Sequence, residues 1–107
     1  MPHKRDRHQE AVRARASVRG LTDAKASSKL RAVAEKCLRR DKKLFADDPH
    51  GLEVIEADHD RLMRIASSIR AGNLEGAYNY ASHLDTLVRE EIPLDVWMYI
   101  GGRGVHE

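Results

Sequence analysis

Apolar residues recur at three- and four-residue spacing along most of this chain, and short turn sequences divide that pattern into segments. The two clearest dividers are Asp47-Asp48-Pro49 and Gly72-Asn73. Asp and Asn cap helix N-termini, Pro suits the first helical turn, and Gly ends helices. No stretch alternates apolar and polar residues between hairpin turn signals. The pattern therefore predicts an all-α fold without a sheet.

Four segments carry the helical pattern. Residues 23–46 predict a long helix, with Thr22 or Asp23 as its N-cap. Its apolar face contains Ala26, Leu30, Val33, Ala34, Cys37, Leu44 and Phe45. A second helix is expected from Pro49 to about Ala71, with a stripe of Leu52, Ile55, Leu62, Ala66 and Ile69. A third is expected from Leu74 to about Ile92, where Pro93 ends it, and it is expected to bury Leu74, Ala77, Tyr78, Ala81, Leu84, Val88 and Ile92.

The remaining segment, Leu94–Ile100, predicts a short helix that stops at Gly101-Gly102. The link at Gly72-Asn73 is so short that the helices on either side of it are expected to be antiparallel. A chain of 107 residues fits one domain. We therefore expect a small antiparallel bundle of three main helices (21–101), a basic N-terminal arm (1–20), a short C-terminal helix with Trp97 docked on the bundle, and a flexible tail (102–107).

The run AGNLEGAYNYASHL, residues 71–84, resembles the second half of many helical hairpins. Tetratricopeptide repeats, ribosomal small-subunit hairpins and some ligand-binding domains of bacterial regulators share this Gly-Asn/Asp…Ala pattern. No second copy follows at a fixed spacing, so a repeat protein is not expected. The resemblance implies helical-hairpin packing and carries no function.

Composition excludes several classes of protein. No apolar run approaches the roughly 20 residues of a transmembrane helix, and the N-terminal MPHKRDRHQE lacks the apolar stretch of a signal peptide. The single cysteine, Cys37, cannot form an internal disulfide. These features predict a soluble, cytoplasmic protein that does not enter membranes.

Charge divides the chain into two unlike halves. Residues 1–46 hold 14 Lys and Arg against 5 Asp and Glu, a net of +9, whereas residues 47–107 hold 5 against 12, a net of −7. On the first long helix, the cations occupy the side opposite the apolar face. Such a division predicts a basic arm and helix joined to an acidic body.

Arginine forks and lysines placed this way suit nucleic-acid phosphates. Residues 1–44 contain no aromatic residue, so contacts to the backbone are expected rather than base stacking. The expected phosphate contacts are Arg5, Arg7, Arg13, Arg15, Arg19, Lys29, Lys36, Arg39, Arg40 and Lys43. The same cations also fit a solvated face, or one that pairs with the acidic half of a second copy.

A polar cluster is expected inside the bundle. His59 interrupts an apolar stripe, Asp41 and Asp85 fall among apolar positions of the neighbouring helices, and Glu91 lies near the edge of its stripe. Glu56 and His59 form a Glu-x-x-His pair, whose members share a helical face. Di-iron bundles need two such pairs and two further Glu residues, so Glu56 and His59 are only weak metal candidates. A buried Asp–His hydrogen bond and a pH-sensitive His59 are alternatives.

Catalysis is not expected. Cys37 lies on an apolar helical face, where cysteine usually packs as a small hydrophobe, and no phosphate loop or nucleophile elbow is present. We therefore predict a non-enzymatic protein without a cofactor.

Contacts with protein are expected from the C-terminal half. Residues 94–100 are unusually apolar for a short helix, and they serve either as a lid on the bundle or as an interface. The expected interaction residues are Leu94, Trp97 and Tyr99, with an acidic row of Glu53, Glu56 and Asp60. A homodimer is the simplest such contact.

The chain is therefore predicted to be a small helical adaptor that binds nucleic-acid backbone, or a nucleoprotein assembly, through its basic arm and first long helix. The alternative is an accessory or inhibitor factor, of the kind found in phages and mobile elements, that docks on an acidic protein surface.

Overall fold

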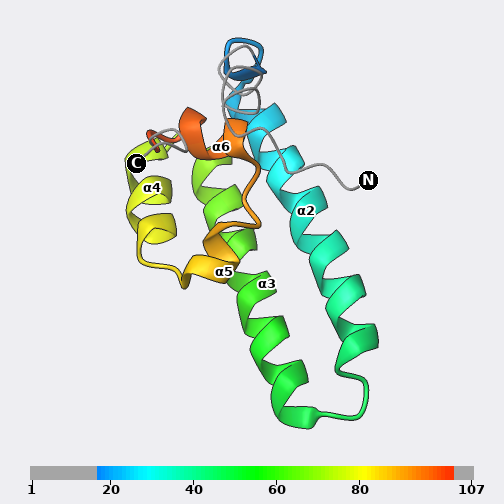
Figure 1. Cartoon of the computed structure of the whole chain (residues 1–107). Coiled ribbons are helices and arrows are strands. Elements are labelled where there is room, and N and C mark those ends of the chain that lie inside the picture. The colour runs from blue at the N-terminus through cyan, green and yellow to red at the C-terminus, as the bar shows by residue number, and fades with distance from the viewer. Residues whose placement is uncertain (1–16, 103–107) are drawn as a thin grey trace, which may run out of the picture.

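The computed structural model describes residues 17–102, and in this part of the chain it contains helices and no strand. The helices are α2 (Asp23–Leu44), α3 (Pro49–Arg70), α4 (Leu74–Ser82), α5 (Thr86–Arg89) and α6 (Leu94–Tyr99). Helix α3 returns alongside α2, and α4, α5 and α6 gather around the half of this pair that is nearer Gly72 (Figure 1). The all-α prediction is therefore confirmed for the described residues.

The ends of the two long helices follow the expected capping chemistry. Thr22 is the N-cap of α2, and its side chain accepts a hydrogen bond from the Lys25 N–H. Asp48 caps α3 in the same way through the Gly51 N–H, and Pro49 occupies the first turn. Asn73 caps α4 through the Gly76 N–H. These three boundaries were predicted correctly.

The core lies between α2, α3 and the shorter helices. Leu30, Ile65, Ile69 and Val96 are the largest apolar side chains that are fully buried. The buried cluster consists of Ala26, Leu30, Ala34, Leu62, Ile65, Ala66, Ile69, Ala77, Ala81, Ile92, Val96 and Ile100. The small alanines at positions 26 and 34 of α2 let that helix pack closely against α3.

The prediction of one long helix from Leu74 to about Ile92 was wrong. Helix α4 ends at Ser82, and the four-residue helix α5 follows after a short break. The Ser82 hydroxyl donates to the Asn79 carbonyl oxygen at 2.9 Å, and His83 Nδ1 lies 2.7 Å from the same oxygen. The His83 N–H, which would bond to this carbonyl in a continued helix, bonds to the Tyr80 carbonyl instead. The backbone instead tightens, and the Leu84 N–H bonds to the Ala81 carbonyl three residues back.

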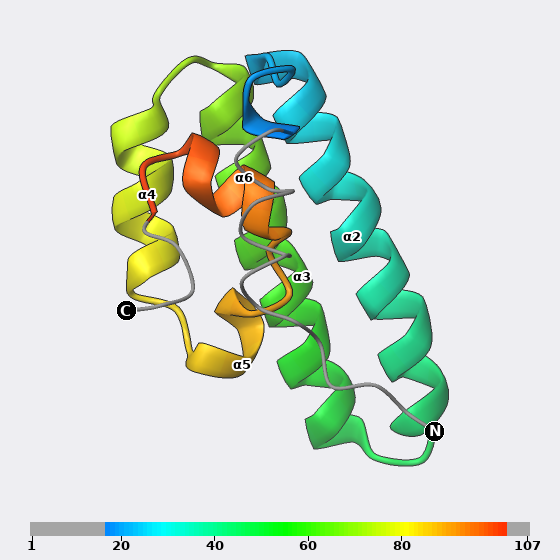
Figure 2. The same cartoon turned by 45° about the horizontal axis from the view of Figure 1, so that its top comes forward.

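The outer half of the α2–α3 pair differs from the expected bundle. Figure 2 shows both helices extending beyond α5, with no described helix over them there. Leu44 and Phe45 were expected on the apolar face of α2, yet Leu44 is 72% exposed and Phe45 38%. Leu44 is the last residue of α2 and Phe45 is its C-cap, so both lie in the outer half, which α5 does not cover.

Candidate functional site

A row of cations runs along the solvent side of α2. At about 100° per residue, Lys25, Lys29, Lys36 and Lys43 fall within roughly 20° of one line, and Arg39 lies beside it. All five side chains are exposed. The opposite side of the helix is held in the core by Leu30 and its neighbours, so the row must face solvent. We call Lys25, Lys29, Lys36, Arg39 and Lys43 the basic ridge.

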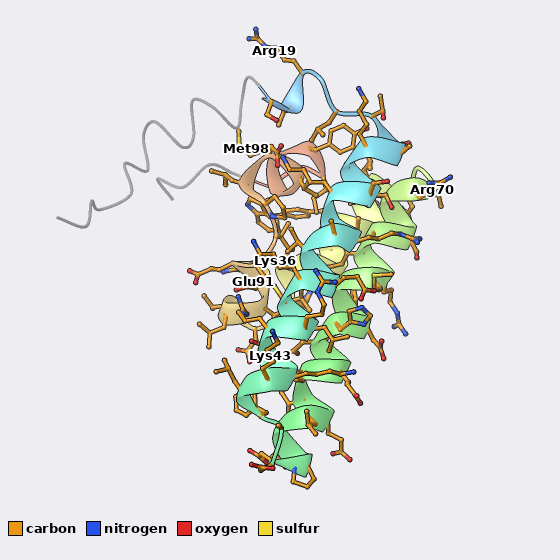
Figure 3. All side chains as sticks on the ribbon, turned by 90° about the vertical axis from the view of Figure 1, so that its right-hand side faces the viewer. Arg19, Lys36, Lys43, Arg70, Glu91 and Met98 are labelled. Carbon is orange, nitrogen blue, oxygen red and sulfur yellow. The ribbon has the colours of Figure 1, made fainter. Side chains whose placement is uncertain are left out.

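The ridge spans about 27 Å, given a rise of about 1.5 Å per residue from Lys25 to Lys43. Figure 3 looks onto α2, and Lys36 and Lys43 lie along that helix, whereas Arg70 lies on α3 on the other side of the pair. Among residues 17–102, no carboxylate forms an ion pair with Lys25, Lys36, Arg39 or Lys43. These four cations therefore keep their charge available to a ligand.

Other cations of the predicted set have partners within the fold. Lys29 forms a salt bridge with the buried Asp95. Arg40 Nε lies 2.8 Å from Asp41 Oδ1, and its Nη1 lies 3.6 Å from Glu91 Oε2. These two residues are therefore poorer candidates for phosphate contacts than the free members of the ridge. Arg19 is exposed at the start of the described chain, and Arg5, Arg7, Arg13 and Arg15 lie outside the described residues.

Beside the ridge, α2, α3 and α5 enclose a groove of about 360 Å³. Its apolar lining comprises Ala34, Leu38, Ile55, Leu62, Leu87 and Val88. Its polar lining comprises Cys37, Arg40, Asp41, Asp58, His59, Glu90 and Glu91. Three members of the predicted polar cluster, Asp41, His59 and Glu91, therefore meet at one place.

The side chains of this cluster are held by separate partners. His59 Nε2 lies 3.1 Å from Glu35 Oε2, and His59 Nδ1 lies 3.4 Å from Asp60 Oδ1. Glu56 instead points to Lys42, with 3.9 Å between the charged atoms. Asp85 is exposed at the start of α5 and does not line the groove. Over residues 17–102, no three His, Cys, Asp or Glu side chains are grouped so that they would hold a metal ion.

Cys37 lies on the groove wall and donates a hydrogen bond to Glu91 Oε2 at 2.6 Å. Burial of the thiol, reinforced by the hydrogen bond and by the negative charge of Glu91, raises the pKa of Cys37 to about 11. The thiolate is the nucleophilic form of cysteine, so this thiol is poorly suited to nucleophilic chemistry near neutral pH.

The apolar C-terminal helix α6 packs as a lid on the bundle. The rings of Tyr78 and Trp97 lie 5.4 Å apart, and the Arg89 guanidinium lies 5.9 Å from the Trp97 ring. The Tyr99 hydroxyl donates to Asp23 Oδ1 at 2.6 Å. Leu94, Trp97 and Tyr99 are all half-buried, so an interface formed by these residues stays a prediction.

Asp95 was not among the candidate residues identified from the sequence. It is buried, and it accepts hydrogen bonds from the Ser17 hydroxyl, the Lys29 ammonium and the Val96 N–H. The sequence did contain a signal for this role, since Asp95 is the one acidic residue in the apolar run of residues 94–100. A carboxylate that is buried with such a run needs hydrogen-bonding or charged partners.

None of the helices in residues 17–102 combines the length and apolar character needed to cross a bilayer. Comparisons with protein-family models, curated proteins and solved structures gave no match to this chain.

Proposed function

We propose that the protein binds the phosphate backbone of nucleic acid, without reading base sequence, through the basic ridge of α2. The observation that carries this proposal is the set of four exposed cations that have no carboxylate partner among the described residues. A duplex carries one negative charge for about every 1.7 Å of its axis, so a straight row about 27 Å long faces many phosphates.

The type of contact follows from the side chains in the ridge. Lysine and arginine bind phosphates through charge and hydrogen bonds, and no aromatic residue lies among them to stack on a base. Backbone contacts orient a protein on a duplex but carry no direct sequence information. In this proposal Arg19 and the arginines at positions 5, 7, 13 and 15 add further phosphate contacts.

The decisive experiment removes three free cations together. In the variant Lys36→Gln, Arg39→Gln, Lys43→Gln, binding to a random-sequence duplex is measured by fluorescence anisotropy over a series of salt concentrations. Each lost phosphate contact reduces the slope of log affinity against log salt by about 0.9, so the triple variant is expected to lose up to about 2.7 from that slope.

A matched control removes the same charge from elsewhere. The variant Arg31→Gln, Lys42→Gln, Arg70→Gln takes away three exposed cations that lie outside the ridge. For this control variant, the slope of log affinity against log salt is expected to be close to that of the wild type. Equal losses in the two triple variants would show that net charge alone drives binding, and the ridge would then have no special role.

The second candidate function is docking on an acidic protein surface through the same cations. It is favoured over the first if duplex DNA, single-stranded DNA and RNA all fail to bind at low salt. That result would overturn the nucleic-acid proposal.

A further inference from the structure

Exposed apolar residues lie next to the groove between α2, α3 and α5, on the outer half of the hairpin. Leu44 lies seven residues after Cys37 on the same face of α2, and Val54 lies four residues before Asp58 on α3. Figure 1 shows α5 crossing near the middle of the hairpin, so the two long helices run on beyond it side by side. We use the name hairpin groove for the groove together with the exposed faces of α2 and α3 that lie beyond α5.

Large apolar side chains are exposed along the hairpin groove. Leu87 is 78% exposed at the groove, Leu44 is 72% exposed, and Val54 is 45% exposed. Single exposed leucines are common on soluble proteins, but several large exposed apolar residues around one groove are typical of a contact site. The exposed large hydrophobics of the described residues are these three and Phe45, at the tip of the same hairpin.

The rim of the groove is negatively charged. Its lining holds one arginine, Arg40, against the four carboxylates of Asp41, Asp58, Glu90 and Glu91. Arg40 is shared between Asp41 and Glu91, so it cannot neutralise both. Asp58 pairs with Arg61, while Glu90 has no ion pair within the described residues. A ligand that fills this groove is therefore favoured by positive charge along its edges.

Both long walls of the groove are helices, and α5 forms a short end wall. A third helix fits between two packed helices because its side chains, at three- and four-residue spacing, enter the groove between theirs. The inner half of the hairpin already has such cover from α4 and α6. The outer half exposes Leu44 and Val54 and has no such cover.

We propose that the hairpin groove binds an amphipathic helix of a partner protein, whose apolar stripe is flanked by lysine and arginine. Leu87, Leu44 and Val54 contact the stripe, and the rim carboxylates face the flanking cations. This site goes beyond the nucleic-acid function, because its apolar and acidic lining includes no residue of the basic ridge. Either site can fail in an experiment without affecting the other.

The test uses a synthetic helical peptide of leucine and lysine with one apolar stripe. Two control peptides accompany it: one has the same composition with the stripe scrambled, and the other has glutamate in place of lysine. The striped basic peptide is expected to bind the full-length protein at least tenfold more tightly than either control, as measured by calorimetry.

Leu87→Ala provides the matched variant. Because Leu87 is largely exposed, its truncation leaves the core intact, and the loss of its contact is expected to weaken peptide binding about tenfold. Thr86→Ala changes the adjacent exposed residue, which does not line the groove, and is expected to bind as the wild type does. Glu90→Gln is expected to weaken binding at low salt only.

Cys37 supplies a local readout. Its thiol lies on the groove wall, so a bound peptide is expected to slow its alkylation by iodoacetamide at about pH 9 several-fold. Equal binding of the scrambled peptide, unchanged binding by Leu87→Ala, or unchanged alkylation would each overturn the proposal. It would also be overturned if the wild type were a dimer in sedimentation and Leu87→Ala a monomer, since the occupant would then be a second copy.

Discussion

Asp95 joins three parts of the chain that lie far apart in the sequence. Its carboxylate accepts from Ser17 before α2, from Lys29 in α2 and from the backbone of Val96 in α6. Burial opposes the charged form of Asp95, but the hydrogen bonds from Lys29 and Ser17 outweigh it and hold the pKa of the carboxyl below its usual value. One buried charge thereby fixes how the lid sits on α2.

Asp95→Asn is expected to lower the free energy of unfolding by about 1–3 kcal/mol, because hydrogen bonds to charged groups contribute about that much. The pH dependence has a definite sign. The pKa of Asp95 is lower in the folded protein than in the unfolded chain, where it is about 3.9. The carboxylate therefore stabilises the fold at pH values above about 3.9, and this stabilisation is lost as the pH falls through the folded pKa. Urea unfolding from about pH 7 down to about pH 2 measures both effects. This role would be contradicted if Asp95→Asn had the same free energy of unfolding as the wild type and lost stability in acid to the same extent.

At the scale of the element, one glycine determines how α3 ends. Gly72 has a φ of +83°, which side-chain-bearing residues rarely adopt. Its N–H bonds to the Ile69 carbonyl, and the Asn73 N–H bonds to the Ser68 carbonyl, which is the Schellman arrangement. The chain can then reverse and begin α4 directly at Leu74.

Gly72→Ala is expected to cost about 1–2 kcal/mol, because a left-handed conformation is unfavourable for alanine by that amount. The cost is conformational rather than steric, since the nearest atom to a Cβ at this position is a carboxylate oxygen of Asp23 at 3.6 Å. Gly20→Ala is a suitable control, because no positive φ occurs there and its nearest atom is also 3.6 Å away. Thermal unfolding that shows equal effects of the two substitutions would refute the argument.

At the scale of the whole molecule, α2 separates two surfaces of unlike chemistry. The basic ridge faces solvent, and the hairpin groove adjoins it around the helix axis, beginning at Arg40 and continuing through Cys37 and Asp41. The net charge of +2 conceals this arrangement, because it sums the unpaired cations of the ridge with the carboxylates that line the groove.

The two proposed ligands are therefore expected to bind at the same time. A saturating amount of the leucine–lysine peptide is expected to change duplex affinity by less than about twofold, since no ridge residue lines the groove. The comparison needs a check that the peptide itself does not bind the duplex under the same salt conditions. Strong competition for a single site would show that the ridge and the groove are not independent.

The local features of this chain were predictable because they depend on neighbouring residues. Capping by Thr22, Asp48 and Asn73, and the turn at Gly72, need only groups a few residues away. The outward direction of Lys36 and Lys43 follows from helical period once the apolar face is known. The break after Ser82 was missed because the apolar pattern runs on through Leu84 and Val88, with no glycine or proline to mark the end of the helix.

Sequence alone determined the helices, their caps and the separation of charge from apolar surface, since each follows from the period of one helix and its flanking residues. The tertiary structure decided which charges are neutralised and which apolar residues stay uncovered. Lys29 pairs with an aspartate 66 residues away, and Leu44 is exposed because it lies in the outer half, which α5 does not cover. Such outcomes depend on distances between segments that no local pattern contains.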